Sequence, residues 1–501
     1  MKDKIIFWLD SELLSYSLAY YLQKNLDSEL YAIIDITNIS KKFFQEQNLV
    51  EFQKTWFYFD NVKPNNKPDI NYLKNIEKKY NIDLWQLAIN ERIFYKYNTF
   101  HHFTNDEILS ILEQECRLFE TIINEIKPAF FITKETIQHK DYLFYKMCRS
   151  AGIKVLVCYE PVIGYKCIIS QEEHKLDFSE DLLSIESKNR SFEDLQNYFK
   201  SSKKSKQVID FRDKYMSSNS DRFKAATKYI LFSNNKNIQT HYTYYGRSKL
   251  RVLFSEFIIF LKRKYREQFM ANNLEKEINK NEKFIYFPLH IEQERSLLIA
   301  APYYTNQIEM LRSVAKSLPM GYTLYVKEHP SQANRNWRSV FDYKEIMDIP
   351  NVRLFHPSFS STELYRNCSL IITVGGASGF EASLHGKPVV LFGDMGYSIL
   401  PSVTKTDKFD NLSEIIRESL LKQVDPADVD RFVTLLEKNS IDFDWSGMSM
   451  EILDRFFYGG YFIDIDISTE TMKSFLNQHQ NEFEKLVSGL VSKIEQFKNE
   501  R

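Results

Sequence analysis

The sequence predicts an α/β protein with two Rossmann-like, doubly wound domains and a helical insert between them. Short apolar runs alternate with amphipathic helical stretches at the beginning of the chain and again in its second half. The stretch between these two regions is polar and rich in lysine. The length of 501 residues is consistent with two or three domains.

Residues 1–170 are expected to form the first domain. KIIFWLD and ELYAIIDI predict strands on either side of the helical SLAYYLQKNL, and WFYFD, PAFFIT and KVLVCYEP predict three more strands. The stretch 104–126 begins with a threonine cap and carries apolar residues at helical period. DYLFYKMCRSAG predicts a helix that ends at Gly152.

Residues 171–280 are expected to be a helical, basic insert or linker. They contain LRVLFSEFIIFLKRKYREQF, an apolar helical segment with a basic end. One interpretation is a helix that packs on the core and leaves its basic end in solvent. The other is an interfacial helix that uses residues 249–269 to contact an anionic membrane.

Residues 281–450 are expected to form the second domain, because βα units repeat there at short spacing. The expected strands are KFIYFPLH, TLYVKEHP, NVRLFHP, LIITVGG and PVVLFG. The expected helices are NQIEMLRSVAKSL, SSTELYRNC and SGFEASLHG. Residues 451–501 are expected to be helical and to pack back over the first domain.

Composition narrows the class of protein. The net charge of −1 gives no overall field that would attract nucleic acid. The five cysteines are odd in number and lack CxxC spacing, which argues against a disulfide framework or a zinc site. Asp10 and Glu12 interrupt the apolar N-terminal stretch, and no apolar run approaches the roughly 20 residues that span a bilayer. We therefore expect a cytoplasmic protein.

Polar and small residues follow the predicted strands of the second domain. They are His290, Lys327, Glu328, His329, His356, the turn from Gly375 to Gly379, and Gly393 with Asp394. In open α/β sheets, ligands bind beyond the carboxyl ends of the strands. These residues therefore predict one binding site along one edge of the sheet.

The glycine-rich turn after LIITV is the strongest single element. Gly375, Gly376 and Gly379 allow a ligand to approach the backbone, and the helix that follows offers free N–H groups to a phosphate. Ser378 could add a hydroxyl. Glu381 could close a capping box with Ser378 or accept hydrogen bonds from ribose hydroxyls. The turn is not GxGxxG, so NAD is not favoured.

In YVKEHP, Pro330 is expected to end the strand because it has no N–H for a ladder, and it holds the preceding residue extended. His329 is then presented rigidly beside Lys327, which suits an anionic group such as a phosphate. The alternative is a structural histidine next to a salt-bridged Lys327–Glu328 pair.

Three stretches, FIYFPLHIEQERSLL, NQIEMLRSVAKSLPMGYTLYVKEHP and LIITVGGASGFEASLHGKPVVLFG, occur in this order over about residues 283–400. This set resembles capsule and surface polysaccharide biosynthesis proteins, which are GT-B glycosyltransferases related in pattern to Kdo transferases and polyol-phosphate transferases. The resemblance implies two domains that face a cleft, with a nucleotide-sugar donor on the second and a glycan or glycolipid acceptor on the first. It implies no metal and no cofactor.

The resemblance also implies roles for individual residues. His329 and Pro330 would contact the donor phosphate, Ser378 would assist, and Glu381 would hold the donor ribose. The acidic pair followed by glycine that supplies the base in related enzymes is absent here.

The catalytic base is therefore sought at strand ends. The candidates are Asp10 and Glu160 in the first domain, and His290 and Glu294 at the opening of the second. Each first-domain acid could instead be a cap or a salt-bridge partner, and Asp10 could cap the helix that follows it. Arg92, His101 and His102 could grip a sugar acid or belong to a surface helix and its loop.

The leading hypothesis is a glycosyltransferase that moves a sugar from a nucleotide-activated donor to a growing cell-surface polysaccharide or glycolipid. A CMP-sugar is slightly favoured over a UDP-sugar, a GDP-sugar or a CDP-polyol. The alternatives are a nucleotide-sugar epimerase of the same fold and a non-catalytic scaffold of a capsule assembly complex. If residues 249–269 bind a membrane, the protein would lie at its inner face.

Overall fold

The computed structural model describes residues 2–64, 67–177, 182–201, 227, 240–457, 459 and 464–499. The chain divides into two compact units, and each collects separate stretches of sequence. Unit 1 comprises Met1–Asp177, Ser202–Leu253 and Asn439–Arg501, and unit 2 comprises Phe178–Ser201 and Phe254–Lys438. The segment 171–280, expected to be one insert, is thus shared between the two units, and 202–226 and 228–239 within it lie outside the described residues.

Unit 1 is built on a seven-stranded sheet with the order β13-β6-β5-β4-β1-β2-β3. The strands are β1 (Asp3–Leu9), β2 (Ser28–Ile34), β3 (Phe52–Phe57), β4 (Phe130–Lys134), β5 (Lys154–Tyr159), β6 (Lys166–Ser170) and β13 (Ile441–Asp442). The first five strands pair in parallel, while β6 and β13 are antiparallel at one edge. The sheet order reverses between β1 and β4, as in doubly wound folds.

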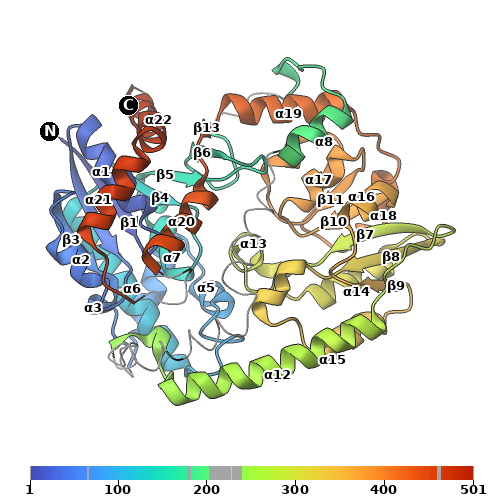
Figure 1. Cartoon of the computed structure of the whole chain (residues 1–501), viewed down its shortest axis with the longest axis horizontal. Helices are drawn as coiled ribbons and strands as arrows, with labels where there is room; N and C mark the ends of the chain where they lie inside the picture. The colour runs from blue at the N-terminus through green and yellow to red at the C-terminus, as the bar shows by residue number, and fades with distance from the viewer. Residues whose placement is uncertain are drawn as a thin grey trace. The chain divides into compact units, whose positions relative to one another are not determined.

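Helices cover both faces of this sheet (Figure 1). They are α1 (Leu14–Asn25), α2 (Lys41–Glu46), α3 (Tyr58–Asn61), α4 (Ile70–Tyr80), α5 (Leu84–Asn90), α6 (Asn105–Ile126), α7 (His139–Ser150), α20 (Trp445–Phe457), α21 (Thr469–Gln478) and α22 (Gln480–Asn499), with the 3₁₀ turn η2 (Tyr242–Tyr244). Phe7 and Leu9 pack with α1, α2 and the C-terminal helices, whereas Ile6 and Trp8 pack with α4 to α7. This alternation is the period of two that a strand buried on both faces requires.

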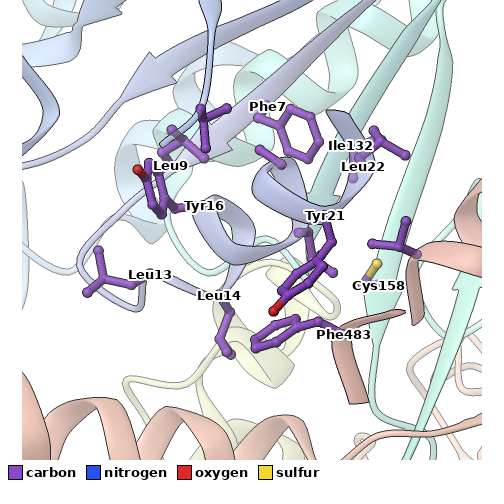
Figure 2. Close-up of a cluster of buried hydrophobic side chains, with 14 of the residues drawn as sticks. Phe7, Leu9, Leu13, Leu14, Tyr16, Tyr21, Leu22, Ile132, Cys158 and Phe483 are labelled. Atoms are coloured by element: carbon purple, nitrogen blue, oxygen red, sulfur yellow. The ribbon is translucent and has the colours of Figure 1, made fainter. Parts of the chain in front are cut away.

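The C-terminal helices complete the first of these faces. Tyr21 of α1 stacks on Phe483 of α22 with ring centroids 5.8 Å apart, and its hydroxyl donates to the Leu476 carbonyl (Figure 2). Met472 and Phe475 of α21 are also fully buried there. The end of the chain therefore belongs to the core of unit 1.

Unit 2 is built on a six-stranded parallel sheet with the order β12-β11-β10-β7-β8-β9. The strands are β7 (Lys283–Pro288), β8 (Tyr322–Lys327), β9 (Val352–Phe355), β10 (Leu370–Thr373), β11 (Val389–Leu391) and β12 (Val403–Lys405). Numbered along the chain from β7, this is the order 3-2-1-4-5-6 of a dinucleotide-type doubly wound sheet.

The helices of unit 2 lie on both faces of its sheet. They are α8 (Phe192–Ser201), most of α12 (Lys249–Asn273), α13 (Arg295–Leu298), α14 (Gln307–Ser317), α15 (Val340–Met347), α16 (Ser361–Asn367), α17 (Ser378–Leu384), α18 (Leu412–Ser419) and α19 (Pro426–Lys438). The 3₁₀ turns are η1 (Leu182–Ser184), η3 (Pro302–Tyr304), η4 (Pro330–Arg335) and η5 (Gly396–Ile399). Ile285 and Phe287 face the core that α14, α15 and α18 share, while α16 packs on the other side of β7.

The predicted α/β class with two Rossmann-like sheets is confirmed, and the GT-B placement of the domains around a cleft stays a prediction. Thr104 caps α6 with a full capping box to Glu107, and Gly152 follows α7 with a φ of 75°, as expected. The strand expected at WFYFD is wrong in its bounds, because β3 ends at Phe57 and α3 begins at once. Within the described part of the chain, no helix is long and apolar enough to cross a membrane.

Candidate functional site

The carboxyl ends of β7, β8 and β10 adjoin one another at the centre of the unit 2 sheet. β7 lies between β10 and β8, so the strand order reverses between β7 and β10. Ligands of open parallel sheets bind at such a switch point. His290, His329 and the turn Gly375–Gly376 follow these three strands, so the structure gathers the main residues predicted for the second domain at one edge.

His290 is buried against the glycine turn. Its Nε2 lies 3.0 Å from Thr373 Oγ1, and the Thr373 hydroxyl donates to the Gly375 carbonyl (3.0 Å). Because that hydroxyl hydrogen is used on Gly375, we assign the imidazole proton to Nε2. Burial, together with the nearby His329 and Arg338, lowers the pKa of His290 to about 3. The ring is therefore neutral and holds the turn in place.

Arg338 is a buried cation beside this turn that the sequence did not reveal. Its guanidinium lies 2.8 Å from a carboxylate oxygen of Glu328, 2.8 Å from one of Glu292, and donates to the His290 carbonyl (2.6 Å). Glu328 also accepts the backbone N–H of His329 (2.7 Å). These bonds tie together the segments after β7 and β8. Arg338 follows Glu328 by ten residues but is 48 residues from His290, and it continues no predicted strand, so the sequence pattern does not single it out.

His329 directs one ring nitrogen away from the backbone. Its Nδ1 accepts the backbone N–H of Ser331 (3.2 Å) in the first turn of η4, so the proton lies on Nε2. The residue is exposed. Partial desolvation, with Lys327 and Arg338, lowers the pKa of His329 to about 4. A neutral N–H donor is therefore offered at the edge of the sheet. Pro330 begins η4, and β8 already ends at Lys327.

Lys327 is buried and donates to the Ser361 hydroxyl (2.7 Å). The expected alternative of a Lys327–Glu328 salt bridge is wrong, because Glu328 pairs with Arg338. Lys327 acts on the edge through its charge, which contributes to the lowered pKa values of His329 and His356. His356 follows β9, two strands away from β7.

Two glycines of the turn are required by close packing. Gly376 has a φ of 71°, and a Cβ there would lie 3.4 Å from His290 Cε1. A Cβ on Gly379 would lie 2.6 Å from the Tyr397 hydroxyl oxygen, and that hydroxyl donates to the Gly376 carbonyl (2.8 Å). Tyr397 is fully buried. The turn is thus fixed from one side by His290 and from the other by Tyr397.

The start of α17 differs from one expectation. Its N-cap is Ala377, without a side-chain capping bond, and Ser378 is the first helical residue. The capping box between Ser378 and Glu381 is therefore wrong. Glu381 donates its backbone N–H to the Ala377 carbonyl (2.8 Å), and its side chain is half-buried. Glu294, a candidate base of this unit, is exposed directly before α13.

Unit 1 has a pocket of about 440 Å³ at the carboxyl ends of β1, β2 and β4. The sheet order also reverses here, between β1 and β4. The charged residues that line the pocket are Asp10, Glu12, Asp35, Glu91, Arg92, Lys134, His139, Lys140, Asp141 and Arg247. Acids and bases are thus mixed in one cavity.

Lys134 joins the two acids that follow β1. Its Nζ lies 2.7 Å from Asp10 Oδ2 and 2.6 Å from Glu12 Oε2. Burial opposes the charge of Lys134, but the two carboxylates raise its pKa above the ordinary value. Asp10 does not cap α1, because the helix begins at Leu14 after Leu13 and has no side-chain cap. It accepts the Glu12 N–H (3.0 Å) and faces the pocket.

His139 is an imidazolium buried between two carboxylates. Its Nδ1 lies 2.7 Å from Glu91 and its Nε2 lies 2.8 Å from Glu115, whose carboxylate also accepts the Tyr58 hydroxyl. Burial opposes its charge, but Glu115 and Glu91 raise the pKa of His139 to about 10. Because the three charged groups come from separate segments, sequence reasoning did not find this cluster.

Two further cations line the pocket. Lys140 lies 2.6 Å from Asp35 Oδ1 and over the Tyr58 ring. Burial raises the pKa of Asp35, and Lys140 opposes that rise. The guanidinium of Arg247 lies over Tyr244, with its carbon 5.7 Å from the ring centroid, and its buried Nε makes no hydrogen bond to any residue that the structure describes.

Glu160 is held by the start of α20. It accepts the backbone N–H (3.1 Å) and the hydroxyl (2.6 Å) of Ser446. It lines a second pocket of about 280 Å³ with Glu135 and Trp445, and this pocket shares Glu12, Lys134 and Ile137 with the larger one. This contact is the capping role that was the alternative to catalysis, and the role of Glu160 as base stays a prediction.

The three residues predicted as one aromatic and basic cluster, Arg92, His101 and His102, lie in different surroundings. Arg92 lines the large pocket of unit 1. His101 lies 3.1 Å from Glu107 and packs on Phe103, and His102 is exposed. Among the residues whose positions are described, no group of three or more His, Cys, Asp or Glu side chains is placed to hold a metal ion.

Residues 185–415 match the family model described as capsule polysaccharide biosynthesis protein. This segment is just under half of the chain and contains His290, His329 and the glycine turn. The likeness to this family that the motifs indicate is therefore confirmed over the matched segment. No curated protein sequence matches the chain.

Several solved structures align with most of this chain, all at low similarity. The N-terminal domain of Candida albicans trehalose-6-phosphate phosphatase has a TM-score of 0.30 and 12% identity, covering 91% of this chain and 96% of that one. Thermosulfurimonas dismutans KpsC, a beta Kdo 2,7 transferase, has a TM-score of 0.30 and 12% identity, covering 74% and 97%. The UDP-GlcNAc 2-epimerase of Methanocaldococcus jannaschii has a TM-score of 0.23 and 13% identity, covering 87% and 99%. Likenesses at this level do not assign an activity.

Proposed function

We propose that the protein is a glycosyltransferase of capsule polysaccharide synthesis. Unit 2 would bind the nucleotide-sugar donor at its switch point, and unit 1 would bind the glycan or glycolipid acceptor in its pocket. The observation that carries the proposal is the cluster of His290, His329 and the glycine turn at the carboxyl ends of three adjoining strands. That cluster lies inside the segment that matches the capsule family.

The donor phosphate would be held mainly by neutral donors. His329 would offer its Nε2–H, and the backbone of the turn Gly375–Gly376 would contact a phosphate oxygen. Lys327 would add positive potential from its buried position. Ser378 and Glu381 would lie next along the chain, where Glu381 could accept bonds from the ribose hydroxyls. Fixed donors of this kind need no reorganisation as charge develops on the leaving phosphate.

In the transfer step, the acceptor hydroxyl oxygen forms a bond to the anomeric carbon as the bond from that carbon to the donor phosphate breaks. The bonding electrons leave with the nucleotide phosphate, and a base takes the hydroxyl proton. Asp10 is the candidate base favoured by position, since it lines the pocket at the switch point of unit 1. Glu160 is the alternative, although Ser446 occupies both of its oxygens.

The donor proposed is a CMP-sugar, ahead of a UDP-sugar, a GDP-sugar or a CDP-polyol, because the HP pair and the later serine resemble those of CMP-sugar enzymes. No cofactor and no metal are part of the proposal. The first experiment is a thermal-shift panel of CMP, CDP, UDP, GDP and their sugars on the purified chain. A ligand that binds only the folded protein raises its midpoint by mass action.

Substitution then tests the site. His329→Ala is expected to weaken donor binding by about tenfold to a hundredfold, since a hydrogen bond to a charged group is worth about 1.5–3 kcal/mol. His356→Ala, at a strand end farther from the switch point, is the matched control and should keep the affinity. An unchanged affinity in folded His329→Ala would reject the phosphate assignment.

Asp10→Asn is expected to lower turnover by about a hundredfold or more while donor affinity stays the same, because general base catalysis contributes roughly that much. Glu12→Gln, which removes the other partner of Lys134, controls for the loss of the ion pair. Turnover of the donor without any acceptor would instead favour the epimerase alternative. The absence of any nucleotide binding would favour the scaffold.

A further inference from the structure

Helix α12 exposes large apolar side chains along one face. They are Leu250, Phe254, Phe257, Phe260, Leu261 and Tyr265, and each is between 36% and 82% exposed. Most are three or four residues apart, so they form a single stripe along the helix. One third of the large apolar residues that stand exposed in the described part of the chain belong to this helix. We refer to these six residues as the α12 stripe.

Basic residues border the α12 stripe. At roughly 100° per residue, Arg251 and Lys262 lie on one side of it and Lys249 lies on the other, while Lys264 falls within it. Of the two acids of the helix, Glu267 is paired with Arg263 (2.9 Å) and lies 3.7 Å from Lys264 Nζ, while Glu256 lies on the same side of the stripe as Lys249. The six Lys and Arg residues of α12 outnumber its two acids, so the helix carries a net positive charge.

The helix is anchored in a way that leaves the stripe uncovered. At its C-terminal end, Met270 is buried and Arg266 donates to the carbonyls of Asn336 and Trp337. Met270 is the only buried residue in all of α12. In Figure 1, α12 is drawn as one long helix. At its N-terminal end, Arg251 donates to the carbonyls of Gly246 and Thr99 (both 3.4 Å). These contacts lie at the two ends of the helix and leave the stripe exposed.

We propose that α12 docks on an anionic lipid surface through the α12 stripe. Its apolar side chains would enter the region between headgroups and acyl chains, and the flanking Lys and Arg would pair with lipid phosphates. The long stems of Lys262 and Lys264 suit this arrangement, because they lie along apolar surface while their ammonium groups reach the headgroups.

The charge pattern favours lipid over a second copy of the chain. If two stripes paired with each other, Lys264 of both copies would be brought into one apolar contact, where like charges repel and desolvation is costly. An anionic headgroup removes both difficulties. The net charge of the whole chain is only −1, so the attraction is local to this helix. The proposed lipid binding does not depend on the proposed glycosyl transfer.

The test is flotation of the full chain with phosphatidylcholine vesicles that contain or lack phosphatidylglycerol. The chain is expected to float with the anionic vesicles and to be released by high salt. Phe257→Ser with Leu261→Ser should reduce the bound fraction by about tenfold or more, as two buried apolar side chains are lost. Met320→Ser with Leu421→Ser, two exposed apolar residues elsewhere, is the matched control and should bind like the unaltered chain.

Charge reversal tests the basic border. Lys262→Glu with Lys264→Glu should weaken binding to anionic vesicles by about tenfold or more, whereas Lys74→Glu with Lys78→Glu on α4 should not. Equal binding by the stripe variant, or no vesicle binding at all, would overturn the proposal. So would equal binding to vesicles without phosphatidylglycerol. A dimer in light scattering that the stripe variant abolishes, without vesicle binding, would assign the face to self-association instead. Donor binding should be unaltered in every α12 variant, so failure here is separate from failure of the proposed enzyme.

Discussion

The two sheets reverse their strand order in the same way, yet the edges at the reversal differ in chemistry. In unit 1 the edge holds ion pairs, with Lys134 between Asp10 and Glu12, and His139 between Glu91 and Glu115. In unit 2 the edge holds two imidazoles with lowered pKa values and a glycine turn.

The difference fits the proposal that the two units bind different kinds of ligand. Fixed N–H donors beside the buried charge of Lys327 suit an anion such as a phosphate, because the donors need no reorganisation to bind it. An edge of paired acids and bases suits hydroxyl groups, which both donate and accept, and it supplies a carboxylate for proton transfer. The histidines mark the contrast: His139 is charged, whereas His290 and His329 are neutral.

The largest expected effect is on stability in unit 1. His139→Ala should lower the free energy of unfolding by about 3–5 kcal/mol, because it leaves Glu91 and Glu115 buried without their counter-charge. His329→Ala should lower it by less than about 1 kcal/mol, since only a cap of η4 is lost. Chemical denaturation of both variants measures the difference. Equal losses of unfolding free energy in the two variants would contradict the distinction between a structural His139 and a ligand-facing His329.

The next effect is at the glycine turn. Gly379→Ala should cost about 1–3 kcal/mol, because its Cβ would come within 2.6 Å of the buried Tyr397 hydroxyl. Gly375→Ala is the control: its Cβ would meet nothing closer than 3.6 Å, so stability should be about unchanged. Thermal unfolding of the two variants gives the comparison. Similar stabilities would mean that Tyr397 yields readily and that the turn is not held by it.

The stability of unit 1 should depend on pH through His139. Its folded pKa, about 10, lies above the ordinary value of 6.5, so its stabilising effect is complete below pH 6.5 and is lost as the pH rises through 10. The difference in unfolding free energy between the unaltered chain and His139→Gln should therefore shrink from pH 6.5 to pH 10. A difference that stays constant over this range would contradict the assigned imidazolium.

The smallest effect is spectroscopic. In NMR of histidine-labelled protein, the rings of His290 and His329 should show neutral Nε2–H tautomers between pH 6 and pH 8. The ring of His139 should show an imidazolium over the same range. A titration midpoint between pH 6 and pH 8 for His290 or His329 would contradict the contrast between neutral histidines in unit 2 and a charged histidine in unit 1.

Much of the fold follows from local sequence. Apolar runs such as KIIFWLD and LIITVGG predict the central strands, because strands buried on both faces are continuously apolar. β6 and β13 escaped notice, since β13 has two residues and becomes a strand only by pairing with a segment about 270 residues earlier. The sequence does not separate α3 from β3, because YFD continues the aromatic run of the strand.

The residues of the candidate site also fall into those that local sequence predicts and those that it does not. His329 and the glycine turn were found because each follows a recognisable strand directly. Arg338 was not found, because its partners Glu328, Glu292 and the His290 carbonyl meet it only after folding. The capping box expected at Ser378 is absent because the N-cap of α17 is Ala377, one residue before Ser378.

The chain enters unit 1 three times, and β13 and α22 supply its last strand and a large part of one core face. During synthesis, the N-terminal stretch therefore leaves the ribosome without the partners of Tyr21 and its neighbours, which are encoded more than 450 residues later. Folding of unit 1 can therefore be completed only after β13 and α22 have been synthesised, and until then the apolar face that they cover is exposed or shielded by a chaperone. A stop codon before the segment that encodes α22 would thus remove part of the core of unit 1.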